Sequence, residues 1–381
     1  MDLSHISAID QHAHNLLRPE VMANTPYTAA FTEGYAPAIV NGHANHTLCY
    51  RRSLREIAEL LNCDSTQETI LRRRTELGLE ELTRLCFGAA NLKAIVLDDG
   101  FLPDTILPVE WHQPFVTTHR LLRLEWLAEQ MIPQVNRFEI FLEWFRSELD
   151  PPPKGVIGFK SVAAYRTGLD IQSIPYDMAA DSFYAIQQGF PGQRIRLADK
   201  PLIDFLLHEA LAIAARYQLP VQFHTGFGDP DLDLRLANPL HLRPLLENPR
   251  YQTVPIVLLH AAYPFTREAG YLTAVYPQVY LDCGLAVPFL SVAGMRQAIA
   301  MMLELSPTSK LMYSSDAHLI PELYYLGAKW GREALAQVLE QAIQDGDLTA
   351  LEAEEVAVAI LAGNASVLYR IGDRATTVPE R

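Results

Sequence analysis

The sequence contains few cysteines, and no spacing between them suggests a pair. Only four occur in the chain, with no CxxC motif among them (Cys49, Cys63, Cys86 and Cys283). A small disulfide-stapled scaffold and a cysteine-based zinc site are therefore excluded. The first residues, MDLSHISAIDQHAH, have neither the basic nor the apolar segment of a secretory leader. Together these features predict a cytoplasmic protein whose thiols stay reduced.

Positive charge and long apolar runs are also scarce. The 31 lysines and arginines are outnumbered by 45 aspartates and glutamates, which gives a formal net charge of −14. Proteins that bind nucleic acid usually carry a basic patch that neutralises phosphates, so this balance disfavours a nucleic-acid partner and also an anionic membrane surface. No apolar run approaches the roughly 20 residues that span a bilayer. We therefore expect a small-molecule substrate and no membrane partner, for a monomer or a homo-oligomer.

The chain instead contains eight short apolar segments, each of strand length. Most of them look buried on both faces, which is typical of parallel strands covered by helices rather than of a half-polar antiparallel sheet. The segments are residues 7–14, 92–99, 116–125, 155–162, 219–226, 254–262, 278–284 and 310–318.

Amphipathic helical patterns lie between most of these segments and after the last one. Two of them begin with capping-box spacing, Ser53/Glu56 and Ser65/Glu68. Eight strand–helix units in series predict an α/β chain folded as one (β/α)₈ TIM barrel over residues 1–381, with further helices at the C-terminal end. A doubly wound open sheet is the alternative, and the count of eight favours closure. The helical patterns cover residues 53–62, 65–90, 133–149, 199–218, 265–276, 322–346 and 353–371.

Two connections are too long to be simple turns. Residues 15–52 follow the first strand and residues 166–198 follow the fourth, and both are rich in proline, glycine, tyrosine and asparagine. Barrel active sites lie at the carboxyl ends of the strands, where both connections start. We therefore predict that both are lid insertions over an active site; surface decoration or oligomer contacts are the alternative.

Polar side chains stand near the carboxyl ends of five of the eight strands. In a closed barrel these ends converge on one mouth, so residues far apart in the sequence become neighbours. His12 and His14 alternate along a strand and share one face, which lets two imidazoles reach one metal ion. The full set is His12, His14, Lys160, His224, His260 and Asp316.

Each of these signals is weak when taken alone. An HxH pair occurs often by chance, a histidine at a strand end is more often hydrogen-bonded and structural, and Asp316 could cap the next helix. Lys160 could simply lie on the surface at a strand end. Their occurrence in the order HxH, Lys, His, His, Asp at equivalent strand ends favours a shared metal site.

The ordered segments IDQHAH, GFKS, QFHTGFGD, LLHAAYPF and YSSDAH resemble the amidohydrolase superfamily of metal-dependent barrel hydrolases. More narrowly, they are similar to the amidohydrolase-2 type that is found fused to a glutamine synthetase. No segment resembling glutamine synthetase follows the barrel in this sequence, which weakens any inference of a glutamyl substrate. The resemblance implies a (β/α)₈ barrel that hydrolyses a C–N bond of a small amide or related molecule with a metal-bound hydroxide.

The resemblance also implies a role for Lys160. In superfamily members with two metals, the lysine of the fourth strand is carboxylated by CO₂ and its carbamate bridges the ions. Physical chemistry agrees, because an unmodified ammonium about 4 Å from a divalent ion would be repelled by about 8 kcal/mol at an effective dielectric of about 20. Burial lowers the pKa of a lysine, and the neutral amine is the form that takes up CO₂.

The expected cofactor is therefore a pair of divalent metals, with Zn²⁺ favoured by the imidazole-rich ligands. One ion is expected at His12, His14 and Asp316, and the other at His224 and His260. The alternative is one ion held by His12, His14, His224 and Asp316. In that case His260 acts as a general acid or orienting residue, and Lys160 binds a substrate carboxylate.

Asp316 is expected to take a proton from the attacking hydroxide and deliver it to the leaving group. A single-metal decarboxylase or isomerase on the same barrel is the alternative function, and a non-catalytic metal-bound signalling or assembly protein is a third. Arg166 is a candidate for a substrate carboxylate, Asp229 for a substrate amine, and His318 for a supporting polar contact. Further possible polar or metal-binding groups are Glu322 and the HxxH pair His43 and His46.

Overall fold

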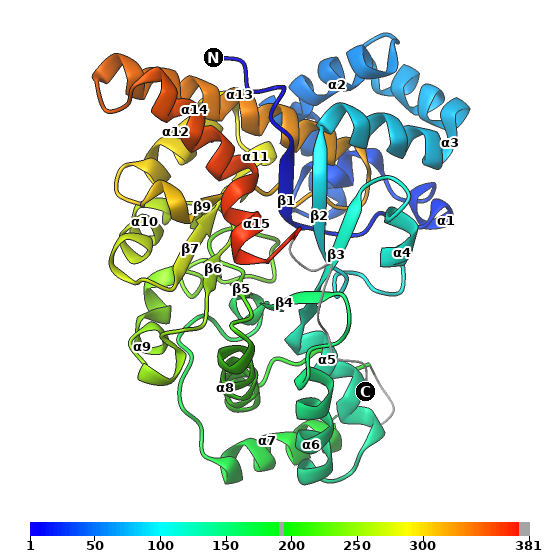
Figure 1. Ribbon diagram of the computed structural model, residues 1–381. Coiled ribbons are helices and arrows are strands. Elements are labelled where there is room, and N and C mark those ends of the chain that lie inside the picture. The colour runs from blue at the N-terminus through cyan, green and yellow to red at the C-terminus, as the bar shows by residue number, and fades with distance from the viewer. Residues whose placement is uncertain (190–193, 373–381) are drawn as a thin grey trace.

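The computed structural model describes residues 1–189 and 194–372 and contains one eight-stranded parallel sheet (Figure 1). The strands follow one another around the sheet in the order β1-β2-β3-β4-β5-β6-β7-β9. All eight lie inside the predicted segments. Their bounds are β1 Ala8–Ala13, β2 Leu92–Asp98, β3 Thr117–Arg123, β4 Val156–Ser161, β5 Val221–Phe223, β6 Ile256–Leu258, β7 Val279–Asp282 and β9 Leu311–Met312, and a two-residue strand β8 Gly284–Leu285 lies outside the sheet.

The sheet closes almost completely on itself. Strand β9 is short, but the chain beyond it runs alongside β1 and exchanges backbone hydrogen bonds with it. The His14 N–H donates to the Ala317 carbonyl at 2.8 Å, and the Asp316 N–H donates to the His12 carbonyl at 3.0 Å. Sequential parallel order with the two ends joined confirms the predicted (β/α)₈ barrel and excludes the doubly wound sheet.

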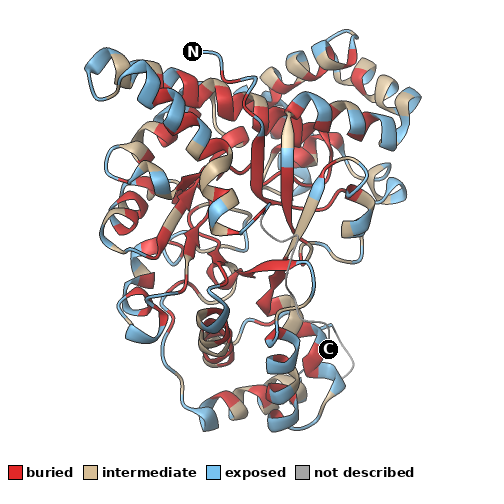
Figure 2. Cartoon of the chain, in the orientation of Figure 1, coloured by how far each residue is buried: buried red, intermediate tan, exposed pale blue. Residues whose placement is uncertain are grey.

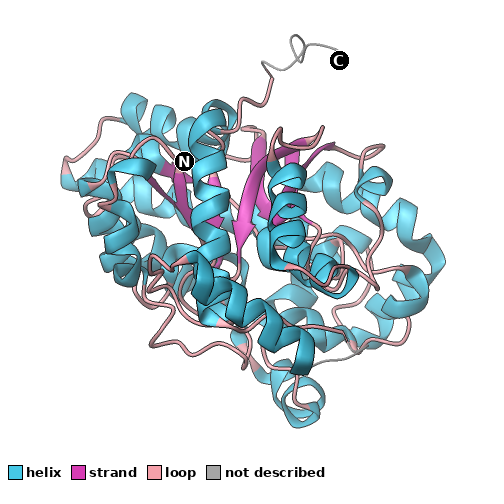
Figure 3. Cartoon of the chain, turned by 90° about the horizontal axis from the view of Figure 1, so that it is seen from below, coloured by secondary structure: helices cyan, strands magenta, loops and turns pink. Residues whose placement is uncertain are grey.

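Helices surround the strands on the outside, as the view from below shows (Figure 3). The helical patterns in the sequence locate α2, α3, α6, α8, α10 and α13, whereas α7 and α12 were not predicted. The bounds are α1 Pro19–Met22, α2 Leu48–Leu61, α3 Gln67–Ala90, α4 Val109–His112, α5 Leu124–Met131, α6 Phe138–Leu149, α7 Tyr176–Gly189, α8 Lys200–Tyr217, α9 Arg243–Leu246, α10 Thr266–Val275, α11 Ala286–Phe289, α12 Val292–Leu303, α13 Glu322–Asp345, α14 Ala350–Val358 and α15 Asn364–Leu368.

The predicted capping boxes of two helices are wrong. Helix α2 begins five residues before Ser53, and its cap is Thr47, whose hydroxyl accepts from the Tyr50 N–H at 3.1 Å. Ser53 lies inside the helix and donates to the Tyr50 carbonyl. Helix α3 is capped by Thr66 rather than by Ser65. Two hydroxyl residues stand next to each other there, and spacing alone does not say which one starts the helix.

The core lies between the strands and the inner faces of the helices, and most strand residues are buried, with the exceptions mainly at the amino ends of β2 and β3 (Figure 2). A second apolar cluster fills the barrel interior near the amino ends of the strands, and Tyr369, just after α15, contributes to it. The Tyr369 hydroxyl reaches Gln11 and Gln222 inside the barrel at 2.7 and 2.8 Å. This packing leaves the carboxyl ends of the strands to form the cavity described below.

The first insertion, residues 15–52, runs over the carboxyl end of the barrel and lines the cavity there with Thr32, Glu33 and Tyr35 among others. Different parts of the second insertion have different surroundings. Its ends contribute Arg166, Arg194 and Arg196 to the cavity, whereas α7 in its middle packs against α6 and α8. In the part of the chain that the structure describes, no helix is both long enough and apolar enough to cross a membrane.

Gly226 allows the loop after β5 to pass close to the turn after β6. It has a φ of +72°, and a Cβ atom there would lie 2.3 Å from the Tyr263 carbonyl oxygen and 2.4 Å from the Ala262 carbonyl carbon. Gly226→Ala should lower the free energy of unfolding by at least about 1–2 kcal/mol, measured by urea denaturation, because a left-handed conformation alone costs an L-residue that much. Gly88→Ala, in an open helical position of α3, is the control and should be neutral or stabilising by up to about 1 kcal/mol. Equal stability of the two variants would contradict the close approach.

Candidate metal centre

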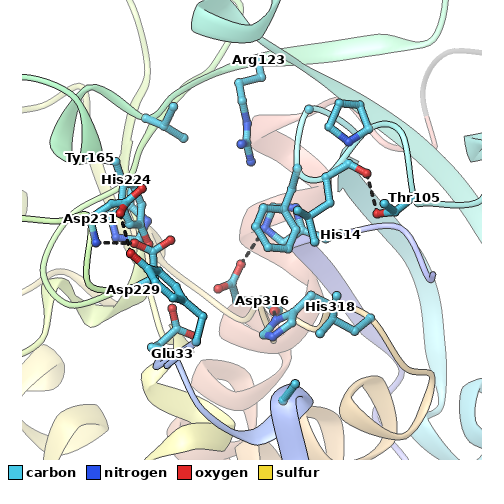
Figure 4. A pocket seen from close by; sticks show the side chains of 18 of the residues that line it. His14, Glu33, Thr105, Arg123, Tyr165, His224, Asp229, Asp231, Asp316 and His318 are labelled. Carbon is cyan, nitrogen blue, oxygen red and sulfur yellow. Dashed lines mark hydrogen bonds and ion pairs between the residues drawn. The ribbon is translucent and has the colours of Figure 1, made fainter. Parts of the chain in front are cut away.

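The polar strand ends meet in one cavity at the carboxyl end of the barrel. Its volume is about 700 Å³, and Figure 4 shows the side chains that project into it from several elements. Strands β1 and β4 and the loops after β1, β5, β6 and β9 all contribute. Among the residues that line the cavity are all six side chains singled out in the sequence: His12, His14, Lys160, His224, His260 and Asp316.

Asp316 stands at the centre of the histidines. Its Oδ1 lies 3.0 Å from His12 Nε2 and 3.2 Å from His14 Nε2, and its Oδ2 lies 4.0 Å from His260 Nδ1. Within the described residues, both ring nitrogens of His12, Nδ1 of His260 and Oδ1 of Asp316 are buried without a hydrogen-bond partner. Buried nitrogen and oxygen lone pairs that converge without donors are what a divalent cation requires, so these residues fit a metal ion.

Backbone carbonyls select the tautomer of two of the histidines. His14 Nδ1 lies 2.9 Å from the Asp98 carbonyl, and His224 Nε2 lies 3.1 Å from the Phe227 carbonyl. A carbonyl oxygen only accepts, so the facing nitrogen carries the proton. The other nitrogen of each ring, Nε2 of His14 and Nδ1 of His224, then keeps its lone pair. Metal-binding histidines are commonly oriented in this way.

Burial keeps the imidazoles of His12, His224 and His260 neutral. The pKa of His12 is lowered to about 4, mainly by burial and also by Lys160 and His14, while Asp316 opposes the shift. The pKa values of His224 and His260 are also well below the ordinary value, again mainly because of burial. The rings pack closely, with centroids 4.4 Å apart for His224 and His260. Neutral imidazole is the form that coordinates metals, so the rings are in a ligand state near pH 7.

Lys160 is an interior residue and not a surface lysine. It lies on β4, is 2% exposed and lines the cavity. Burial lowers its pKa to about 8, although Asp98 and Asp316 favour the charged form. A lysine with this pKa has an appreciable neutral fraction near pH 8, and that fraction can act as a nucleophile.

Two buried residues at the site were not recognised in the sequence. Asp98 ends β2 and Arg123 ends β3, and the Arg123 guanidinium donates to both oxygens of Asp98, with distances of 3.1 Å from Nε and 2.6 Å from Nη2. One Asp98 oxygen also lies within 4.8 Å of ligand atoms of His12 and His14. The signal was available, because LDD and RLLRLE also end apolar segments with polar side chains, but neighbouring polar residues hid which one faces inward.

The structure also locates the predicted substrate-binding residues. Arg166, Asp229 and His318 all line the cavity. Arg166 pairs with Glu129 at 3.2 Å, Asp229 accepts from the Asp231 N–H at 2.8 Å, and His318 Nδ1 lies 2.9 Å from the Asp316 carbonyl.

Three weaker candidates lie elsewhere. Glu322 is fully buried beside Arg74, whose Nε is 2.6 Å from Glu322 Oε1, and it does not line the cavity. His43 and His46 are exposed in the first insertion and belong to no metal-sized cluster of described residues. An HxxH spacing brings two imidazoles onto one face only in a regular helix, and these two residues fall in separate short helical turns, η2 Ile39–His43 and η3 Ala44–His46.

The backbone at the centre adopts a left-handed conformation. His260, Ala261 and Ala262 have φ values of 69°, 51° and 46°, and Asp316 has a φ of 55°. Non-glycine residues rarely adopt such values and do so where the surrounding structure enforces them. Buried carboxylates supply that constraint on both sides: Asp282 Oδ1 accepts from the His260 N–H at 2.6 Å, and Asp10 Oδ1 accepts from the Ser315 N–H at 2.9 Å.

The Asp282 carboxylate accepts hydrogen bonds from four groups. Besides the His260 N–H, its carboxylate accepts from the Gly284 N–H at 3.3 Å, from the Ser314 hydroxyl at 2.6 Å and from the Gln11 amide. The residue ends β7 and is fully buried. It therefore connects β1, the turn after β6 and the chain beyond β9.

Asp282→Asn should weaken metal binding by about 10–100-fold, because the new NH₂ group faces a donor and releases the His260 turn. The measurement is a competition titration with a chelator. Asp204→Asn is the matched control: Asp204 in α8 is also fully buried, but it bonds Lys200 of the same helix and the N–H of Gln172 in a loop, and it does not line the cavity. Both variants should lose stability, and only Asp282→Asn should lose metal affinity. Equal metal affinity in the two variants would contradict the role of Asp282.

Comparison with known proteins places this site in a family. The family model described as "Amidohydrolase" matches residues 180–371. The Protein fluG of Emericella nidulans is 32% identical over 405 residues, an alignment that covers 96% of this chain and 46% of the fungal protein. The chain thus spans about half the length of that relative.

Solved structures agree with the fold. A protein from Lactobacillus casei, whose inferred activity is that of a metal-dependent hydrolase, superposes with a TM-score of 0.87 at 27% identity and 98% coverage of both chains. A uronate isomerase from Thermotoga maritima superposes with a TM-score of 0.65 at 13% identity, covering 96% of this chain and 95% of its own, and shares the fold alone. The family match, the fluG similarity and the ordered strand-end residues lead to one conclusion: the chain belongs to the amidohydrolase family of metal-dependent (β/α)₈ barrels.

Proposed function

We propose that the protein hydrolyses a C–N bond in a small amide or related molecule, with a divalent metal held at the carboxyl end of the barrel. The observation that carries this proposal is the buried Asp316 carboxylate, which contacts His12 and His14 at 3.0 and 3.2 Å and opens onto a cavity of about 700 Å³. The carboxylate can exchange protons with a bound substrate, and the cavity is the size of a small-molecule site.

The favoured metal centre is a pair of zinc ions. His12, His14 and Asp316 would hold one ion, and His224 and His260 would hold the other. Lys160, once carboxylated, would bridge the two. The burial of Lys160 and its pKa of about 8 support this chemistry, because the amine must be neutral to react with CO₂.

Different residues of the chain have different roles in the proposed reaction. When bound, the metal supplies Lewis-acid polarisation of the substrate carbonyl and a nucleophilic water at neutral pH. Asp316 accepts the proton of the attacking water and passes it to the leaving nitrogen. His260 lies 4.0 Å from Asp316 Oδ2, and in the alternative with a single metal it would act as a general acid or orient this carboxylate. Arg166 would bind a substrate carboxylate, Asp229 an amine, and His318 would fix Asp316 through the bond to its backbone carbonyl.

A single-metal decarboxylase or isomerase is the second candidate function, and one observation favours it. The ligand atoms of His12, His260 and Asp316 lie within 4.8 Å of one another, whereas His224 belongs to no such group among the described residues. One ion could therefore be held by His12, His260 and Asp316. This set differs from the single-ion set expected from the sequence, in which His224 and not His260 is a ligand. In that case Lys160 keeps its ammonium and binds a carboxylate.

Asp316→Asn should reduce kcat by about 10²–10⁴-fold, because an amide cannot shuttle the proton, while the histidines retain much of the metal. Turnover is measured on an amide identified from a panel of N-acyl and γ-glutamyl amides, and metal content by elemental analysis. Asp233→Asn, in a loop outside the cavity, is the control and should match the wild type. Activity near the wild-type value in Asp316→Asn would remove Asp316 from the proton-transfer role.

Metal content distinguishes the two candidate functions. Protein purified without chelator and supplemented with zinc and bicarbonate should contain two equivalents of metal per chain. The same preparation should lose the second equivalent in Lys160→Ala and regain it when a short-chain carboxylic acid is added. A constant value of about one equivalent under all conditions would favour the single-metal decarboxylase or isomerase.

A further inference from the structure

One wall of the cavity carries two carboxylates that the metal centre does not use. Glu33 comes from the first insertion, and Asp229 comes from the loop after β5. Figure 4 shows both side chains on the same side of the cavity, close to Asp316, His224 and Tyr165. The Tyr165 ring packs on the His224 ring at a centroid distance of 4.3 Å, so this wall is continuous with the metal centre.

The arginines of the cavity do not neutralise these two acids. Each arginine that lines the cavity has its own carboxylate partner. The pairs are Arg123–Asp98 at 2.6 Å, Arg166–Glu129 at 3.2 Å, Arg194–Asp104 at 2.6 Å and Arg196–Asp231 at 2.9 Å.

Glu33 has neither a hydrogen bond nor an ion pair among the residues that the structure describes. Its pKa is raised to about 8, mainly by burial and also by the carboxylates of Asp316 and Asp229. Asp229 accepts one backbone N–H, from Asp231, and its pKa is also raised, mainly by burial, although Arg196 and Arg166 oppose the shift. Two half-buried carboxylates on one wall without a cation between them repel each other, and a positive charge there would relieve that repulsion.

The position of Glu33 is fixed by a contact between the two loops. The hydroxyl of Tyr35 donates to Asp231 Oδ1 at 2.8 Å, and Asp231 is also bonded to Arg196. Asp231 stands two residues after Asp229. The contact therefore holds the backbone next to Glu33 against the loop that carries Asp229, and the two acids face the same space.

We propose that Glu33 and Asp229 together bind a protonated amine of the substrate, so that the natural substrate is an amide that carries an ammonium group near its scissile bond. The assignment of the substrate as an amide rests on the proposed function. The assignment of the ammonium group rests on the positions of Glu33 and Asp229. Each carboxylate accepts N–H bonds from the ammonium, and charge-assisted bonds of this kind are strong in an enclosed site. The amine would lie beside His224, with the reacting carbonyl directed towards Asp316.

The test is equilibrium binding, measured by isothermal titration calorimetry on the zinc-loaded full chain. The probes are glycinamide, β-alaninamide and 4-aminobutanamide, each compared with the neutral amide of the same length: acetamide, propionamide and butanamide. At least one amine probe should bind at least tenfold more tightly than its neutral partner. Glu33→Gln and Asp229→Asn should each remove most of that difference and leave the affinity for neutral amides within twofold.

The control is Glu20→Gln, an exposed position in the same insertion that does not line the cavity, and it should behave as the wild type. Equal binding of amine and neutral probes by the wild type would overturn the proposal. So would a parallel loss of both in Glu33→Gln, which would indicate a structural role. A lower metal stoichiometry in Glu33→Gln, with unchanged amine affinity, would assign the two acids to a metal and also overturn it.

Binding needs no turnover, so the two proposals fail separately. If the amine preference is present but no amide is hydrolysed, the C–N hydrolase assignment is wrong and the ammonium site stands. If amides with and without an amine are hydrolysed equally well, the C–N hydrolase assignment stands and the ammonium site is wrong.

Discussion

The site depends on one electrostatic constraint, the burial of the Asp316 carboxylate among imidazoles that are themselves too buried to carry charge. A buried anion needs a cation or several hydrogen-bond donors. The Asp316 Oδ1 atom has no hydrogen-bond partner in the described structure, and the neighbouring rings of His12 and His260 are held neutral by burial. Each neutral imidazole keeps one nitrogen lone pair, so the site presents an anionic oxygen and several nitrogen lone pairs, an arrangement that a divalent cation stabilises. The strained turn at His260 and the buried acids Asp10 and Asp282 serve to hold this arrangement.

The sequence predicted the parts of the fold that depend on local pattern. The segments that look apolar on both faces identified every barrel strand. The alternation of side chains along a strand predicted that His12 and His14 share one face. Strand lengths were less predictable. Strands β5 and β6 have only three residues each, because the following residues leave the sheet to form the cavity wall. That departure depends on long-range contacts, such as the bond from the His260 N–H to Asp282 at 2.6 Å, which spans 22 positions.

The place of Glu33 in the site could not be predicted from the sequence. The residue lies in an insertion that has no strand or helix periodicity, and nothing in TEGYAP marks the glutamate as an inward-facing residue. Its position follows from the bond between Tyr35 and Asp231, which are 196 positions apart. Asp98 and Arg123 were missed for a different reason. Both stand at strand ends, as the recognised residues do, but each neutralises the other, and a sequence does not show pairing between strands.

The Asp98–Arg123 pair also bears on how many metals the site holds. Asp98 is close enough to His12 and His14 to complete a metal site with them. Arg123 occupies both of its oxygens, however, and lowers the pKa of Asp98 well below its usual range, so this carboxylate is committed to the arginine. A second metal would then need its extra negative charge from elsewhere in the barrel. In the proposed two-metal centre, carboxylation of Lys160, which is buried on β4 next to the strand of Arg123, would supply that charge. If Lys160 stays an ammonium, the proposed centre would hold one ion only, so the state of this side chain would distinguish the two proposed functions.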